Sequence, residues 1–123
     1  MCQTADEGKS PDELLAEVYR EFRDGLARRI DTIRSALERL ASAYDAGAAD
    51  TFYRTAHTLK GTAASFEADE LVDPAEGLAD LGLRWFEDGD LDPLEVSAAF
   101  RHLEELEGAV QRYLERVEGD AVG

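Results

Sequence analysis

The stretch PDELLAEVYREFRDGLARRIDTIRSALERLASAY, residues 11–44, is the longest patterned segment of the chain and predicts one long helix. Its apolar residues recur at spacings of three and four, so they form one stripe on a helix of about 3.6 residues per turn. Ser10 precedes it as an N-cap, with Pro11 at the first helical position and Glu13 at the third. Gly25 is a candidate for a kink. The expected stripe consists of Leu14, Val18, Phe22, Leu26, Ile30, Ile33, Leu37, Leu40 and Tyr44.

Three further amphipathic segments follow, at about residues 48–66, 68–87 and 93–118. Pro74 lies inside the third segment and predicts either a restart or a kink of that helix. Asp92 is placed to cap the fourth. No segment shows the alternation that is typical of strands. The expected buried residues of these helices are Phe52, Ala56, Leu59, Ala63, Phe66, Leu71, Leu78, Leu81, Trp85, Val96, Phe100, Leu103, Leu106, Val110, Tyr113 and Val117.

Four amphipathic helices joined by short turns predict an all-α fold, an antiparallel up-down four-helix bundle. At 123 residues the chain has the length of one domain. We expect that domain to span residues 1–123, with loose termini at 1–10 and 119–123.

The net charge, the cysteine count and the absence of long apolar runs exclude several kinds of partner and site. A formal net charge of −15 argues against nucleic acid, which is itself a polyanion. The same acidity serves solubility, or it attracts a partner with a basic surface. The single cysteine, Cys2, rules out an internal disulfide and a zinc site built on cysteines. No apolar run approaches the ~20 residues of a membrane span, and the N-terminus lacks a signal-peptide pattern, so we expect a cytoplasmic protein.

The segment TAHTLKGTAASFE, residues 55–67, carries the most informative side chains. On a helical wheel of about 100° per residue, His57 lies roughly 160° from the centre of the apolar stripe. Gly61 and Ala64 lie close to it on the same face, with Tyr53 and Lys60 to one side. The sequence therefore predicts an exposed histidine with two very small neighbours.

Gly61 needs an explanation, because glycine inside a helix costs about 1 kcal/mol relative to alanine. A close approach by another molecule would supply one, since a missing side chain lets a partner backbone come near. An exposed imidazole, a neighbouring ammonium group on Lys60 and open space above the helix suit phosphoryl transfer between proteins.

The run AHTLKGTAASF, residues 56–66, resembles the signature of histidine phosphotransfer (HPt) domains of bacterial two-component phosphorelays, in which the pattern is A-H-x-L-K-G-S-A followed by an apolar residue and usually Gly. FYRTAHTLKG, residues 52–61, is most similar to the N-terminal modules of chemotaxis-type histidine kinases. The resemblance covers most of the chain.

The resemblance implies that His57 accepts the phosphoryl group on the ring nitrogen farther from the backbone. Lys60 would steady that group, and Gly61 would make room for a receiver domain. Tyr53, Arg54, Ala64, Glu67 and Arg84 would contribute to partner binding. Such domains act as monomers without kinase or phosphatase activity, and they bind receivers or histidine kinases. They hold no cofactor or metal, because the Mg²⁺ of the transfer reaction belongs to the receiver.

The chain departs from the family pattern at three positions. Glu67 stands where the family usually has Gly, and Pro74 interrupts a helix that is usually unbroken. Ala79 stands near the place where chemotaxis-type members carry a Glu that orients the histidine; Glu76 and Asp80 are the candidates to replace it. Arg54 and Arg84 either add positive potential near His57 or pair with nearby acids.

Two other classes of function compete with phosphotransfer for these residues. A docking module that binds a receiver without accepting phosphate would use the same surface. A di-iron bundle needs Glu three residues before His, but Arg54 and Ala99 occupy those positions before His57 and His102. We interpret His102 as structural or merely exposed. Trp85 and Phe86 are interpreted as core and helix-end packing.

Overall fold

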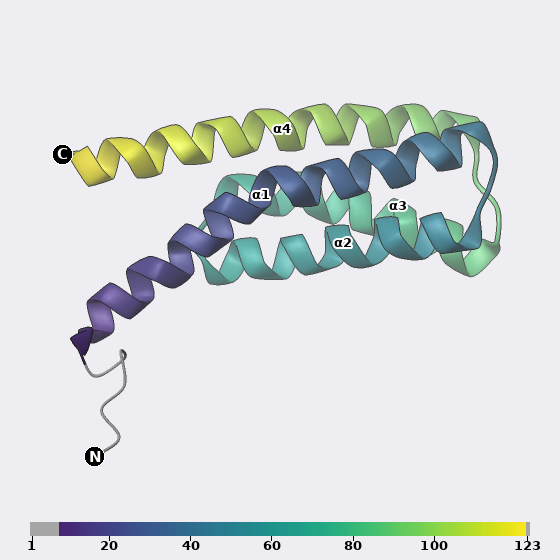
Figure 1. Cartoon of the computed structure of the whole chain (residues 1–123). Coiled ribbons are helices and arrows are strands. Elements are labelled where there is room, and N and C mark those ends of the chain that lie inside the picture. Colours follow the sequence, from purple (N-terminus) through teal and green to yellow (C-terminus); the bar gives the residue numbers. More distant parts are fainter. Residues whose placement is uncertain (1–7, 123) are drawn as a thin grey trace, which may run out of the picture.

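The computed structural model describes residues 8–122, of which the side chains are described to residue 119. Its element order is α1 (Pro11–Ser42), α2 (Ala46–Ser65), the 3-10 turn η2 (Asp69–Leu71), α3 (Val72–Asp88) and α4 (Pro93–Val122). Figure 1 shows the helices lying lengthwise along one another with alternating chain direction, and each packs against the next while α1 also contacts α4. The predicted all-α four-helix bundle is therefore confirmed.

Local capping explains most helix starts. The backbone N–H of Glu13 donates to the Ser10 hydroxyl at 3.1 Å, and the N–H of Leu94 donates to the Asp92 carboxylate at 2.8 Å, as the sequence predicted. α3 begins at Val72, so Pro74 falls in its first turn, where backbone N–H groups have no intrahelical acceptor, and the proline removes no helical hydrogen bond.

Several helix boundaries differ from the prediction. α3 begins at Val72, four residues later than expected, because Asp69–Leu71 forms a 3-10 turn. α2 begins at Ala46, two residues early, because the Asp45 carboxylate accepts from the N–H groups of Gly47 at 2.8 Å and Ala48 at 3.2 Å. These two bonds also lower the pKa of Asp45. α1 ends at Ser42, and Tyr44 instead donates its hydroxyl to the Trp85 carbonyl at 3.3 Å. α4 continues past residue 118 to Val122.

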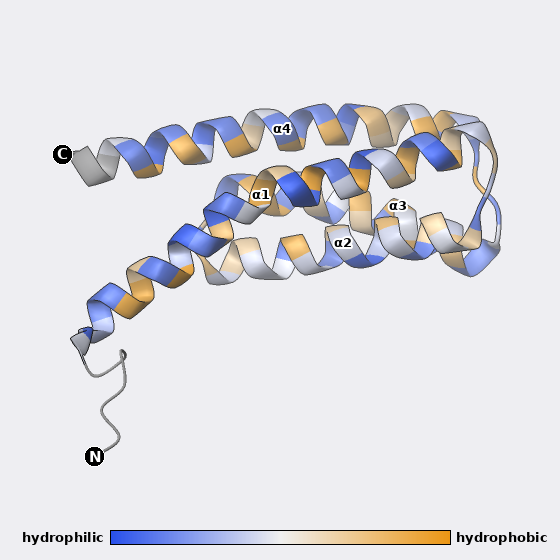
Figure 2. Cartoon of the chain, viewed as in Figure 1, coloured by the Kyte–Doolittle hydropathy of each residue, from blue (hydrophilic) through white to orange (hydrophobic). Residues whose placement is uncertain are grey.

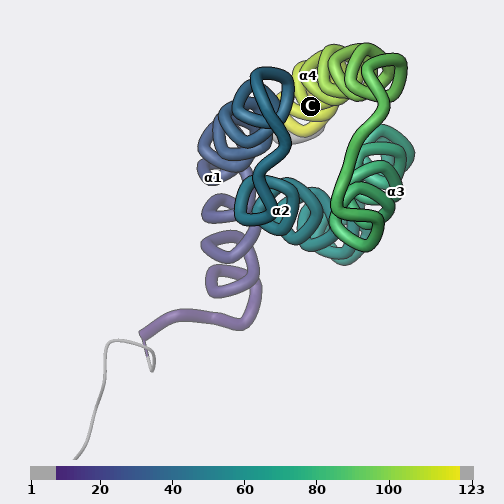
Figure 3. The backbone as a smooth tube through the Cα atoms, turned by 90° about the vertical axis from the view of Figure 1, so that its right-hand side faces the viewer, coloured from purple at the N-terminus to yellow at the C-terminus, as the bar shows by residue number. Residues whose placement is uncertain are grey.

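The prediction that Leu14 and Val18 are buried is wrong, because they are 37% and 47% exposed. At about 1.5 Å per residue, the 32-residue α1 is much longer than the 20-residue α2. Phe66, just after α2, packs against Tyr19 at 5.0 Å and Phe22 at 4.7 Å between ring centroids, so the α1 residues before Tyr19 extend beyond the end of α2. Figures 1 and 3 show this N-terminal part of α1 leaving the bundle at an angle, while the helix continues unbroken through Gly25.

The core lies between the four helices, where their apolar stripes meet (Figure 2). Its largest fully buried side chains are Trp85, Tyr113, Phe52, Leu26, Ile33, Leu37, Leu40, Leu59, Leu71, Leu78 and Leu106. α2 and α3 approach especially closely at Gly82, where a Cβ atom would lie 2.9 Å from the Tyr53 Cα. This contact sets the spacing of the two helices that carry the motif and its neighbours.

Of the expected loose termini, residues 1–7 and 123 lie outside the described residues. Residue 10 caps α1, and 119–122 continue α4. The extent of the domain, residues 1–123, stays a prediction.

Candidate functional site

His57 lies in the middle of α2 on its exposed face. Its ring lies beside that of Tyr53, with centroids 5.6 Å apart and planes tilted by 33°. Among residues 8–122, its imidazole makes no hydrogen bond or ion pair. The ring nitrogens are therefore open to solvent and to any molecule that approaches α2 from outside.

The side chain of Lys60 reaches from α2 to Glu76 on α3. Its Nζ lies 2.7 Å from Oε2 of Glu76, and both side chains are partly exposed. The hydrogen bond to Glu76 and the charge of that carboxylate raise the pKa of Lys60, and the charge of Asp80 adds to the effect. Lys60 is therefore a protonated ammonium group that is already paired.

Gly61 and Ala64 extend the exposed face of α2 beyond His57. A Cβ atom added at Gly61 would meet nothing within 4 Å, so packing inside the molecule does not require glycine there. Gly61 therefore lowers the stability of α2, and no packing contact inside the molecule offsets this cost.

The two arginines proposed for partner binding are both paired. Arg54 Nε lies 2.7 Å from the Asp50 carboxylate, one turn back on α2. Arg84 Nη2 lies 2.5 Å from the Glu95 carboxylate of α4. Of the two interpretations left open by the sequence, ion pairing describes both, and the structure directs Arg84 toward α4 rather than toward His57.

Ala79 is buried at the interface, with 4% exposed surface, and carries no group that could orient His57. Glu76, one candidate replacement, binds Lys60. The Glu76–Lys60 pair was not predicted from the sequence, because it joins two helices whose relative rotation the sequence pattern leaves open.

Glu67 has φ of 58°, and it is the one non-glycine residue with positive φ among residues 8–122. This left-handed conformation ends α2 and costs a side chain about 1 kcal/mol or more. Its carbonyl accepts from Arg116 Nη2 at 2.9 Å, and Arg116 Nε also binds the Glu70 carboxylate at 2.7 Å. The turn after α2 is thus held by α4, and glycine would suit its backbone better.

We expect Glu67→Gly to stabilise the fold by about 0.5–1 kcal/mol, because glycine adopts positive φ without the steric cost. Thermal and urea unfolding measure the change. Glu67→Ala is the matched control, since it removes the carboxylate and keeps the strained backbone. Equal effects of the two substitutions would assign the change to charge instead.

His102 is half-buried and packs against Gly77 of α3, where a Cβ atom would lie 3.1 Å from the imidazole carbon Cε1. Its Nδ1 is buried with no hydrogen-bond partner among the described residues. This position supports the structural interpretation of His102. Trp85 is likewise a core residue, as predicted, with its Nε1–H donating to Glu95 at 3.2 Å.

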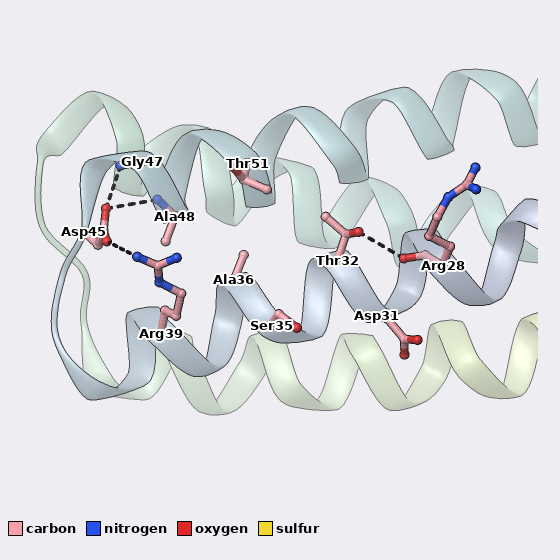
Figure 4. Close-up of a pocket in the computed structure, with 10 residues that line it drawn as sticks. All are labelled: Arg28, Asp31, Thr32, Ser35, Ala36, Arg39, Asp45, Gly47, Ala48 and Thr51. Atoms are coloured by element: carbon pink, nitrogen blue, oxygen red, sulfur yellow. Dashed lines mark hydrogen bonds and ion pairs between the residues drawn. The ribbon is translucent and has the colours of Figure 1, made fainter.

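A groove of about 580 Å³ lies between α1 and the start of α2 (Figure 4). Arg39 crosses it to bind the Asp45 carboxylate at 3.1 Å. His57 and Lys60 are not among its lining residues. The exposed histidine therefore stands on an open helix face, which is a shape suited to a protein partner more than to a small molecule.

Within 8–122, no helix combines the length and the apolarity that crossing a bilayer requires. The same part of the chain contains no group of three or more His, Cys, Asp or Glu side chains that could hold a metal ion.

The fold is a four-helix bundle that presents a histidine on an exposed helix face, with a lysine and a glycine three and four residues further along the same helix. The family model described as "Hpt domain" matches residues 17–119, and the chain belongs to this family. Comparisons with curated proteins and with solved structures gave no match. Hpt domains are phosphocarriers of histidine phosphorelays, and their partners are two-component receivers and kinases.

Proposed function

We propose that this chain accepts a phosphoryl group on His57 and exchanges it with the aspartate of a receiver domain. The observation that carries the proposal is the exposed, unbonded imidazole of His57 within the region matched by the family. Similarity to the chemotaxis-kinase type of module is part of the same proposal and rests on the residues 52–61 alone.

The transfer step follows from the chemistry of the imidazole. The lone pair of Nε2 forms a bond to phosphorus, the bond between phosphorus and the aspartyl oxygen breaks, and its electron pair returns to the aspartate carboxylate. The proton on Nδ1 stays on the ring until solvent removes it. Lys60 offsets the charge of the phosphoryl oxygens. The Mg²⁺ ion would be supplied by the receiver, and we propose no cofactor or catalytic activity for this chain.

Partner contacts would spread along α2. Gly61 and Ala64 share the exposed face of His57, the half-buried Tyr53 lies beside its ring, and Glu67 lies at the end of this face. Arg54 is exposed on the same helix and could exchange its Asp50 partner for one on the receiver. We propose a monomer, because a second copy is not needed to complete this face. The cytoplasmic location stays a prediction.

The test is to incubate the purified chain with a phosphorylated receiver or with an active histidine kinase. We expect an acid-labile, alkali-stable phosphate on the protein, which is the signature of phosphohistidine. The alternative, a docking module that accepts no phosphate, is motivated by the Glu67 and Ala79 departures. Receiver binding without any transfer would support it and contradict phosphotransfer.

Gly61→Leu is expected to slow transfer from a phosphorylated receiver by about 10- to 100-fold, because its side chain would occupy the approach to His57. The fold should be stabilised by roughly 0.5–1 kcal/mol, since the site has room and leucine favours helix. Transfer rates and thermal unfolding measure the two effects.

Gly61→Ala provides the matched control for that substitution. It should bring a similar gain in stability with a smaller loss of transfer. If Gly61→Leu transferred phosphate as fast as the wild type, the open space above α2 would have no role in docking.

A further inference from the structure

The positive charges nearest His57 on α2 are already neutralised in this structure. Lys60 is held by Glu76 at 2.7 Å, and Arg54 is held by Asp50 at 2.7 Å. Asp80, one turn beyond Glu76 on α3, adds further negative charge near Lys60. A phosphoryl group on His57 would therefore meet a lysine that already has an anionic partner.

Glu76 and a phosphoryl group would need the same ammonium group. Lysine has a flexible stem and three donors, so Lys60 can turn toward either anion or be shared between them. Glu76 is fixed on α3, and its side chain is 48% exposed, so water can hydrate the carboxylate when Lys60 leaves.

The Lys60–Glu76 ion pair contributes little to the stability of the fold, because both side chains are partly exposed. The α2–α3 interface is instead held by fully buried side chains such as Phe52, Leu59 and Leu78. Glu76 can therefore influence the occupancy of His57 without being needed for the fold.

We propose that Glu76 competes with the phosphoryl group for Lys60 and thereby lowers the phosphate occupancy of His57. The inference rests on the proposed function and adds a residue of α3 that regulates the same site. Glu76 lowers the phosphate occupancy of His57 in two ways: its carboxylate pairs with Lys60, which is then not available to the phosphoryl group, and its negative charge repels the phosphoryl oxygens. A residue that merely positioned Lys60 for catalysis would act in the opposite direction.

The test measures phosphate occupancy with phosphoramidate as the donor, in the presence of excess ammonium so that the phosphoryl group can pass both ways. Phosphoramidate is a small molecule and phosphorylates His57 without a receiver protein, so the measured ratio does not depend on receiver binding. Glu76→Gln in the full chain should raise the ratio of phosphorylated to free His57 about two- to fivefold. Intact mass and ³¹P NMR give the ratio.

Two controls separate the causes. Glu87→Gln removes a charge from another exposed position of α3 and should leave the ratio nearly unchanged. In a Lys60→Gln background, the effect of Glu76→Gln should shrink, because only direct repulsion remains. Circular dichroism confirms that each variant is folded.

The outcomes are distinguishable. A ratio that stays equal or falls in Glu76→Gln, while the wild type is labelled, overturns the competition and leaves the proposed function standing. An undiminished effect without Lys60 also overturns it. A wild type that neither phosphoramidate nor a phosphorylated receiver can label overturns the proposed function, and this inference with it.

Discussion

His57→Gln is expected to reduce phosphate incorporation to background. Glutamine has a similar size, but its amide nitrogen lacks the available lone pair of an imidazole, so it cannot attack phosphorus. His57 is exposed and makes no hydrogen bond within residues 8–122, so the fold should be unaffected. Labelling by a phosphorylated receiver, followed by acid and alkali treatment, measures the loss.

The second histidine provides the matched control. The sequence contains only His57 and His102. His102 packs against Gly77 with its Nδ1 buried, so it is poorly placed to accept a phosphoryl group from another protein. His102→Gln should therefore retain the label, provided that circular dichroism shows a folded chain. If His57→Gln were labelled as well as the wild type, the assignment of His57 as phosphoacceptor would be wrong.

Trp85→Ala is expected to destabilise the bundle by about 3–5 kcal/mol, which lowers Tm by roughly 10–20 °C. Trp85 is 1% exposed, and its ring lies 5.4 Å from that of Phe52, between centroids. The substitution leaves a cavity that the helices can fill only in part. It also removes the donor to Glu95. Urea unfolding followed by circular dichroism measures the change.

Phe86→Ala is the neighbouring control. Phe86 is 44% exposed on the same helix, so its removal should cost about 1 kcal/mol or less. Trp85→Phe should lie between the two, because it keeps an aromatic ring in the core and loses the N–H donor. Equal costs for Trp85→Ala and Phe86→Ala would contradict the assignment of Trp85 to the core.

The positions of the helices were predictable because their signals are local. Ser10 and Asp92 cap helices through hydrogen bonds to residues two or three positions along the chain, and such bonds need no tertiary structure. The exposure of His57 and Gly61 likewise follows from their angle to the apolar stripe of one helix.

The predictions that failed concern the burial of side chains, which depends on the neighbouring helices. Leu14 and Val18 continue the apolar stripe of α1, yet this part of the helix extends beyond the end of α2 and diverges from α4, so both side chains are left partly exposed. The sequence pattern shows which face of a helix is apolar, but not how far the other helices extend. For Arg84 the sequence left two interpretations open, and its position on α3 decides for an ion pair, with Glu95 of α4.

By itself, the sequence determined the all-α fold and the exposed face of α2 with His57, Lys60 and Gly61, because both follow from periodicity along one helix. Only the tertiary structure decided which groups meet across helices. It paired Lys60 with Glu76 and joined Arg116 to the left-handed turn at Glu67. Such contacts depend on the rotation and offset of whole helices, which are set by the packing of all their side chains together.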